Sequence, residues 1–102
     1  MDYEVAWSES AFTSLIDALE YVARDSPSYA AALALRADRA ASSLSTFPER
    51  GRRVHEFNDP DVRELHVESY RLIYRVSSKR FLILALVHKA RDLSILLDDS
   101  AQ

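Results

Sequence analysis

Seven side chains that can bind a phosphodiester or move its protons fall between residues 63 and 91, on successive strand-like runs. They are Arg63, His66, Arg71, Tyr74, Arg75, His88 and Arg91. Guanidinium groups bind phosphate oxygens through paired hydrogen bonds, and an imidazole exchanges protons near neutral pH. Metal-free RNA cleavage needs few groups beyond these. The same residues also fit an ordinary sheet, with Tyr70 and Tyr74 as core rings and arginine stems lying over apolar neighbours. The chemistry alone leaves both interpretations open.

Other catalytic classes find little support in the sequence. The histidines His55, His66 and His88 are scattered over a loop, a strand and a strand end, without the spacing of a metal site. The chain has no cysteine, which excludes a disulfide, a thiolate metal site and a cysteine nucleophile. Its single glycine provides no phosphate-cradling loop, and no serine stands in a nucleophile elbow. We therefore expect neither a metal nor another cofactor.

Charge is distributed unevenly along the 102 residues. Residues 1–49 carry three Arg against eight acids, which gives −5, whereas residues 50–102 carry ten Lys or Arg against eight acids, which gives +2. The stretch from 70 to 91 contains no acid beside its six cations, Arg71, Arg75, Lys79, Arg80, Lys89 and Arg91. Such a cluster indicates either an anion- or partner-binding patch or a solvated sheet face.

The elements that must position these side chains follow from hydrophobic periodicity. Residues 3–7 alternate as a short strand. Apolar residues at steps of three and four predict one helix over 9–24 and a second that begins at Pro27 and is ended by Pro48, with Ser8 and Ser26 as caps. The buried faces should comprise Phe12, Leu15, Ile16, Leu19, Val22 and Ala23 in the first helix, and Ala30, Leu33, Ala37, Ala40, Leu44 and Phe47 in the second.

Three further strand-like runs, at 62–67, 70–76 and 80–87, are separated by very short polar connections and predict an antiparallel meander. The last run is apolar on both faces and should lie centrally in the sheet. Within YRLIYRV, Tyr70, Leu72 and Tyr74 should face the helices, and Arg71 and Arg75 the opposite side, where a partner could cover them. The order β-α-α-β-β-β predicts one α+β domain over residues 1–102, a helical hairpin packed on a small antiparallel sheet.

The order of elements and several local segments resemble the RelE/ParE superfamily of bacterial type II toxin–antitoxin modules, and most closely its ParE branch. The resemblance covers nearly the whole chain and is carried by VAWSESA, ARDSP, FPERGRRVHEF, RELHVESYRLIYRV and LVHKARD. It implies a toxin held inactive in a hetero-oligomer by a cognate antitoxin, whose C-terminal segment wraps the hairpin and the sheet. The alanine-rich second helix would offer shallow grooves to such a segment.

Two activities occur in the superfamily: RelE-like members are ribosome-dependent mRNA endonucleases, and ParE-like members poison DNA gyrase without nuclease activity. For the RelE-like alternative, the resemblance implies Arg63, His88 and Arg91 as catalytic residues. The segment DLSILLDD after Arg91 offers no Tyr or His as the acid–base group, and Glu68 would repel an RNA phosphate. The net charge of −3 is also unfavourable in an RNA-lined site. These departures favour the ParE-like interpretation.

In that interpretation the chain acts through protein contacts and binds no nucleic acid directly. The partner-binding residues should be Arg63, Arg71, Arg75, Lys89 and Arg91. Because the N-terminus lacks the pattern of a signal peptide, and no apolar stretch is long enough to cross a membrane, we expect a cytoplasmic protein.

Overall fold

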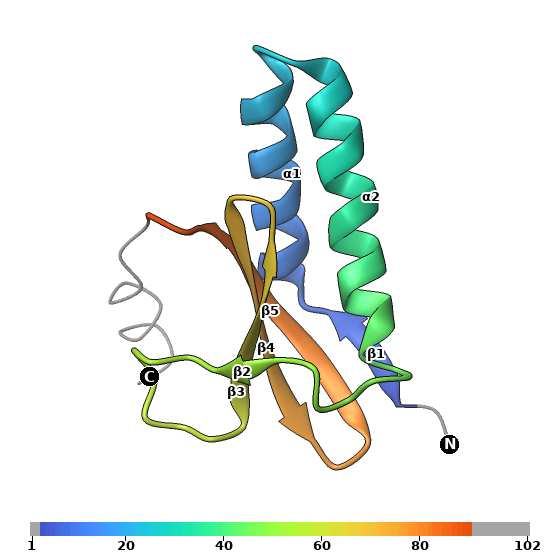
Figure 1. The fold of residues 1–102 in the computed structure, drawn as a ribbon, viewed down its shortest axis with the longest axis vertical. Coiled ribbons are helices and arrows are strands. Elements are labelled where there is room, and N and C mark those ends of the chain that lie inside the picture. The colour runs from blue at the N-terminus through green and yellow to red at the C-terminus, as the bar shows by residue number, and fades with distance from the viewer. Residues whose placement is uncertain (1–2, 91–102) are drawn as a thin grey trace.

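The computed structural model describes residues 3–90 of the chain. Two helices form a hairpin that stands against one face of a five-stranded sheet (Figure 1). In chain order the elements are β1 (Glu4–Trp7), α1 (Glu9–Ala23), α2 (Pro27–Ser43), β2 (Arg52–Arg53), β3 (Val62–Val67), β4 (Tyr70–Ser77) and β5 (Arg80–His88). The α+β class is confirmed. No helix among these residues is both long and apolar enough to cross a membrane.

The strands lie in the order β1-β5-β4-β3-β2. The antiparallel meander β3-β4-β5 is confirmed, and β5 is an interior strand as its apolar faces predict. The sheet is nevertheless mixed, because β1 pairs parallel to β5, from Glu4 opposite Arg80 to Trp7 opposite Ile83. The two-residue strand β2, antiparallel to β3, is an addition to the predicted elements, since two residues are too few to show an alternation.

Both predicted helix caps are present. The Ser8 hydroxyl accepts a hydrogen bond from the Ala11 N–H at 3.0 Å, and the Ser26 hydroxyl accepts one from the Tyr29 N–H at 3.2 Å. The helix α2 ends at Ser43 and not near Pro48. The hydroxyls of Ser43 and Ser45 donate to backbone carbonyls one turn earlier, and serine competes with the helix in this way, so the serine run ends α2 before the proline is reached.

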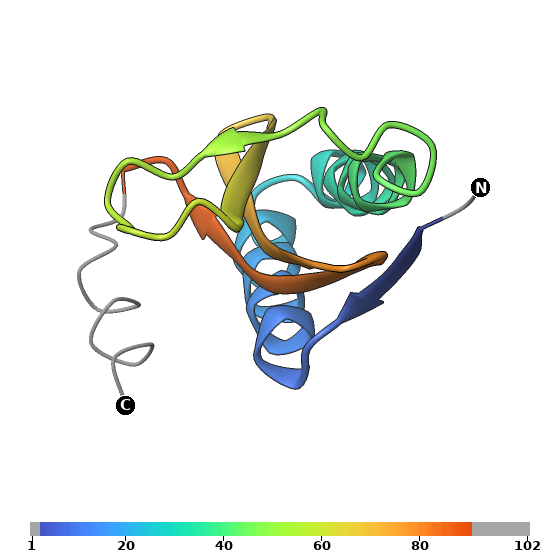
Figure 2. The same ribbon diagram turned by 90° about the horizontal axis from the view of Figure 1, so that it is seen from below.

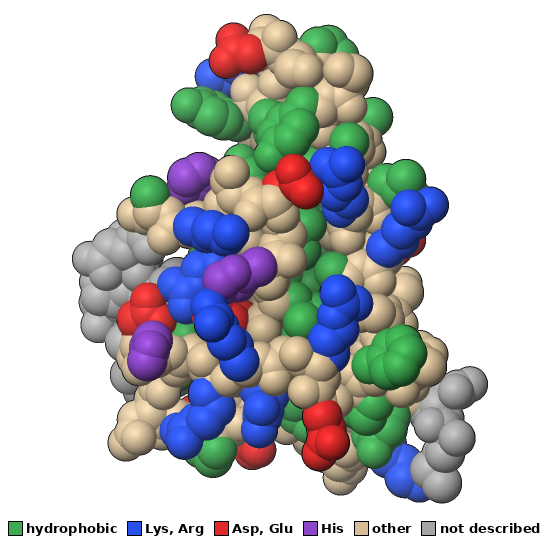
Figure 3. All heavy atoms as spheres, in the orientation of Figure 1, with side chains coloured by type: hydrophobic (Ala, Val, Ile, Leu, Met, Phe, Trp, Pro, Cys, Tyr) green, Lys and Arg blue, Asp and Glu red, His purple; other side chains and the backbone are tan. Residues whose placement is uncertain are grey.

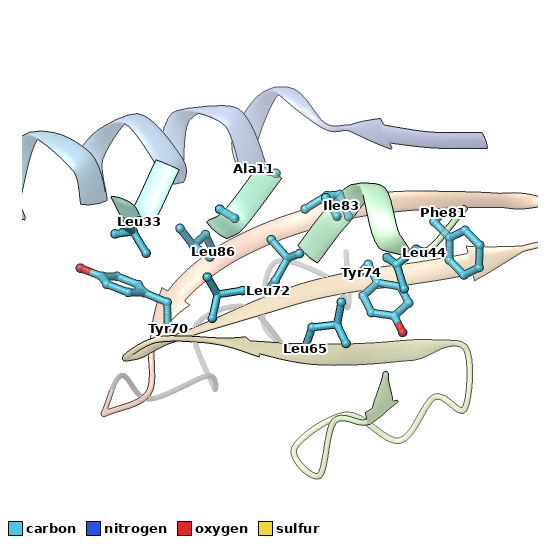
Figure 4. Packing of buried hydrophobic residues seen from close by; sticks show 13 residues of the cluster. Ala11, Leu33, Leu44, Leu65, Tyr70, Leu72, Tyr74, Phe81, Ile83 and Leu86 are labelled. Carbon is cyan, nitrogen blue, oxygen red and sulfur yellow. The ribbon is translucent and has the colours of Figure 1, made fainter. Parts of the chain in front are cut away.

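The main core lies between the helical hairpin and the sheet (Figure 4). Its fully buried large side chains include Leu33, Leu44, Leu72, Tyr74, Phe81 and Ile83. The alanines at 30, 37 and 41 of α2 are buried as well, so they allow close packing within the chain itself. Three residues that were expected to be buried are exposed: Phe12, Ile16 and Phe47.

The exposure of Phe12 and Ile16 follows from how α1 is rotated about its axis. The small residues Ala11, Ser14 and Ala18 form the stripe that faces β5, and the Ser14 hydroxyl accepts a hydrogen bond from the Leu86 N–H at 2.9 Å. That amide lies just beyond an irregularity in the β4–β5 register. A buried strand amide needs a partner, and Ser14 supplies it, so Phe12 and Ile16 turn outwards while the other large apolar side chains of the predicted face pack against the core.

A second, smaller core covers the opposite face of the sheet. Val54 and Phe57, from the segment between β2 and β3, pack there against Val62, Ile73 and Val87. Seen end-on, α2 and the segment 54–61 lie on opposite sides of the meander (Figure 2). The predicted division of YRLIYRV is confirmed, since Tyr70, Leu72 and Tyr74 belong to the helix-side core and Ile73 to the other.

Candidate functional site

Arg71 lies on the sheet face opposite the helices and is held by two carboxylates of the same chain. Its Nε donates to Glu64, and its Nη1 and Nη2 donate to the two oxygens of Glu56, both at 3.0 Å. The side chains of Arg71 and Glu64 are only 11% and 6% exposed. The hydrogen bonds from Arg71 lower the pKa of the Glu56 carboxyl, and Glu56 in turn raises the pKa of the Arg71 guanidinium. The guanidinium group of Arg71 is therefore already bound by carboxylates of its own chain.

Arg75, two residues further along the same face, is also paired. Its Nη1 donates to Asp59 at 2.6 Å. The Asp61 N–H, 2.9 Å from the other Asp59 oxygen, and then Arg75 lower the pKa of the Asp59 carboxyl. Glu56 and Asp59 both belong to the segment 54–61, which is thus fixed to β4 by two ion pairs. This segment pairs with both arginines that we expected a partner to cover; Arg71 is buried, whereas the Arg75 side chain stays 41% exposed.

Glu64 also anchors a small polar group at the outer edge of the sheet. Its second oxygen lies 3.5 Å from Arg52 Nε and 3.7 Å from His66 Nε2. Arg52 Nη2 and His66 Nε2 are 3.0 Å apart. Three cations of the acid-free run thus have carboxylate partners in space: Arg71 and Arg75 from residues 56–64, and Arg80 from Glu4.

The remaining predicted site residues do not join Arg71 and Arg75. By strand alternation Arg63 faces the helix side, where its Nη1 donates to the Gly51 carbonyl at 3.3 Å. His88 and Lys89 are exposed at the end of β5. The His88 ring packs edge-on against Tyr70 at 5.3 Å, and its Nδ1 accepts from the Ala90 N–H at 3.1 Å. Arg91 lies outside the described residues. The predicted site residues therefore do not lie together in one site, and their role in partner binding stays a prediction.

A basic cleft, which the sequence reasoning missed, runs along the outer edge of β3. Its lining residues are Arg36, Arg39 and Ala40 from α2, Arg50 from the following loop, and His66, Val67 and Glu68 from β3 and its turn. The cleft holds about 240 Å³. Blue and purple side chains gather on this face of the molecule (Figure 3). In the sequence, the spacing of Arg36 and Arg39 on one helix face was the signal from which this cleft could have been predicted. Residues 3–90 contain no group of three His, Asp or Glu arranged to hold a metal ion.

Comparison with known proteins gives consistent matches over most of the chain. Residues 5–93 match the family described as the ParE toxin of the type II toxin–antitoxin system parDE. Toxin RelE2 of Caulobacter vibrioides is 35% identical over 89 residues, which are 86% of this chain and 97% of that protein.

Two solved structures share the fold. The first is from the chromosomal ParDE system of P. aeruginosa, with a TM-score of 0.68 and 21% identity over 84% of this chain and 95% of the other. The second is from the toxin–antitoxin complex RelBE2 of Mycobacterium tuberculosis, with a TM-score of 0.59 and 23% identity over 89% of this chain and 95% of the other.

Proposed function

The chain belongs to the ParE/RelE family of type II toxins, and from this premise we propose that it arrests bacterial growth by binding and poisoning DNA gyrase. We further propose that a cognate antitoxin neutralises it in a hetero-oligomeric complex in the cytoplasm. The family membership gives the class of protein. The choice of gyrase as the target depends on the charged groups on the sheet face opposite the helices.

One observation carries that choice: the guanidinium of Arg71 is bound on three of its nitrogens by Glu64 and Glu56. A ribonuclease that held its phosphodiester on this face would need the cations of the face to be free. Here an incoming phosphate would have to displace a bidentate carboxylate from Arg71 and would face the negative charge of both acids. The arrangement therefore supports a protein target over an RNA substrate.

Exposed groups on other parts of the surface support protein contacts. Phe12, Tyr21 and Phe47 are 56%, 68% and 62% exposed. Large aromatic side chains and arginine are the residue types that most often anchor protein interfaces. Arg63, Arg71, Arg75, Lys89 and Arg91 remain our proposed partner-binding residues; among them Lys89 is exposed at the end of β5, and Arg71 and Arg75 would act through the segment that they hold.

The RelE-like alternative, a metal-free ribonuclease that uses Arg63, His88 and Arg91, is favoured by one observation. His88 is exposed, and because its Nδ1 is occupied by the Ala90 N–H, Nε2 is the ring nitrogen that could exchange a proton with a ligand. Lys89 follows it directly and could hold a phosphate oxygen.

Two assays on the purified chain separate the candidates. In a gyrase supercoiling assay we expect inhibition and an accumulation of cleaved DNA complexes, with wild type and His88→Ala equally effective. In a translating extract we expect mRNA to remain intact. Ribosome-dependent mRNA cuts that disappear in His88→Ala would overturn the proposal in favour of the ribonuclease.

Expression in bacteria without an antitoxin is the accompanying control. We expect growth arrest from the wild-type chain. Normal growth with folded protein in the cells would mean that the chain has lost toxicity and only binds its antitoxin.

A further inference from the structure

A concave pocket lies where α1 meets the end of β5, and aromatic side chains from three elements line it. We call it the aromatic pocket. It holds about 460 Å³, and its lining residues include Asp17, Ala18 and Tyr21 from α1, Tyr70 from β4, and Leu86 and His88 from β5. Apolar and aromatic walls around a few polar groups are typical of a site for a small molecule.

Part of the aromatic pocket is fixed by packing in the core. Tyr70 is buried at one end of the helix-side core (Figure 4), and the His88 ring packs edge-on against it. Burial, and then the neighbouring phenols of Tyr29 and Tyr21, raise the pKa of Tyr70, so its hydroxyl stays protonated at neutral pH. The pocket therefore presents uncharged aromatic rings that are already in position for a ligand.

The Tyr21 ring already attracts a cation of its own chain. The Arg24 Cζ lies 5.9 Å from the centre of this ring, within the range of a cation–π interaction. The Tyr21 side chain is exposed, and exposed contacts of this kind are weak. The ring is thus placed so that a positive charge can lie against it, while Arg24 is not among the residues that line the pocket.

Asp17 gives the aromatic pocket a negative charge. Its side chain is exposed, and within residues 3–90 no Lys or Arg forms an ion pair with it. The His88 Nδ1 accepts a hydrogen bond from the Ala90 N–H, so this ring is neutral in the structure. The helix α1 itself contains acids and no Lys or Arg. The electric field at the pocket therefore favours a cation over an anion.

We propose that the aromatic pocket binds a small organic ammonium ion, with its charge beside Asp17 and its carbon substituents against the rings of Tyr21 and Tyr70. The carboxylate and the faces of the rings attract the charge, and the rings also cover the alkyl groups. A metal ion such as Mg²⁺ or Ca²⁺ needs several oxygen ligands, which one carboxylate does not provide. The inference does not depend on the proposed function.

The test titrates the full isotope-labelled chain with choline, a quaternary ammonium ion, and follows the backbone amide signals by NMR. We expect choline to bind with a Kd of about 1 mM or below and to shift the amide signals of Ala18, Leu86 and His88. The neutral isostere of choline, in which a carbon atom replaces the nitrogen, should bind at least about tenfold more weakly, because it carries no charge for the carboxylate and the rings to attract.

Two matched double variants locate the site. Asp17→Asn should weaken choline binding about fivefold, and Asp17→Asn/Tyr21→Leu about tenfold or more, because the second change also removes a π face. The control Asp38→Asn/Phe47→Leu makes the same kinds of change at exposed positions outside the pocket and should alter the Kd less than about twofold. Both members of each pair are exposed, and the amide spectrum shows directly whether each variant is folded.

Three results would overturn the proposal: no binding of choline, equal affinities for choline and its neutral isostere, or equal losses in the two double variants. A blocked lysine peptide that binds at least about tenfold more tightly than choline, with the same dependence on Asp17 and Tyr21, would assign the pocket to a side chain of a partner protein instead. The gyrase and mRNA assays do not bear on this titration.

Discussion

At the scale of single residues, the tightest constraint is between Gly51 and Tyr74. The Tyr74 side chain is fully buried, burial raises the pKa of its hydroxyl, and that hydroxyl has no hydrogen-bond partner of normal geometry among residues 3–90. A Cβ at Gly51 would lie 1.9 Å from the Tyr74 oxygen and 2.9 Å from the Glu64 carbonyl oxygen. The φ angle of Gly51 is not positive, so space and not backbone conformation requires glycine here.

We expect Gly51→Ala to destabilise the fold by about 3 kcal/mol, because the added methyl must displace a buried ring or a strand carbonyl. Urea denaturation measures this change in the free energy of unfolding. The same substitution in a Tyr74→Leu background should cost at least about 1 kcal/mol less, since the phenol is gone. Equal costs in the two backgrounds would show that Tyr74 is not the obstacle.

A second residue-scale prediction compares a buried arginine with an exposed one. Arg71→Gln removes the buried partner of Glu64, whose side chain is 6% exposed and which keeps as a charged partner only the longer contact with the exposed Arg52, and should cost about 3 kcal/mol of unfolding free energy. Arg80→Gln breaks the pair with Glu4, in which both side chains are more than half exposed, and should cost less than about 0.5 kcal/mol. Thermal denaturation of both variants under the same conditions compares their stabilities. Similar shifts of the melting temperature in the two variants would contradict the prediction.

At the scale of elements, the sequence patterns located the helices and strands well but not their rotation. The run VRELHV predicts β3 with its bounds, because strand alternation is visible in six residues. The face that α1 buries could not be predicted, because the partner of Ser14 is an amide 72 residues away at a sheet irregularity. Hydrophobic periodicity shows that a helix has a buried face, whereas a long-range hydrogen bond determines which face of α1 is buried.

The segment 54–61 behaves as an element without regular structure, and its attachment to β4 should depend on pH. The pKa values of Glu56 and Asp59 are lowered in the folded state, so each carboxylate stabilises the fold above its unfolded pKa. This contribution is lost as the pH falls through the lower folded value. We expect the unfolding free energy to decline below about pH 4.5, the ordinary pKa of Glu56.

The comparison with Glu56→Gln isolates one of these groups. At neutral pH the wild type should be more stable than the variant, and the difference should shrink as the pH falls below about 4.5. Urea denaturation over a pH series measures it. A difference that stays constant down to the acid limit would mean that the Glu56 charge contributes nothing.

At the scale of the whole molecule, the surface carries apolar side chains that its own core does not use. Phe12→Gln should leave the unfolding free energy within about 0.5 kcal/mol of the wild type, because the ring is 56% exposed and glutamine suits a helix. Leu33→Ala, at a fully buried position, should cost about 2–5 kcal/mol. Chemical denaturation gives both values, and equal losses in the two variants would contradict the prediction.

The candidate site was less predictable than the fold, because charge pairing depends on the whole chain. The acid-free run from 70 to 91 indicated either an anion- or partner-binding patch or a solvated sheet face. In the folded molecule Glu56, Asp59 and Glu64 come to it from a loop and a neighbouring strand. The cleft at Arg36, Arg39 and Arg50 arises in the opposite way, because α2 and the loop after it bring these three cations beside the His66 end of β3.

The parallel pairing of β1 with β5 has a consequence for the order of events during synthesis. Glu4 pairs with Arg80, so β1 finds its neighbour only after residues 80–83 have followed it out of the ribosome. Until then both the N-terminal strand and the faces of the helical hairpin lack the sheet that covers them. A nascent chain therefore keeps these surfaces uncovered until residues 80–83 are available to pair with β1.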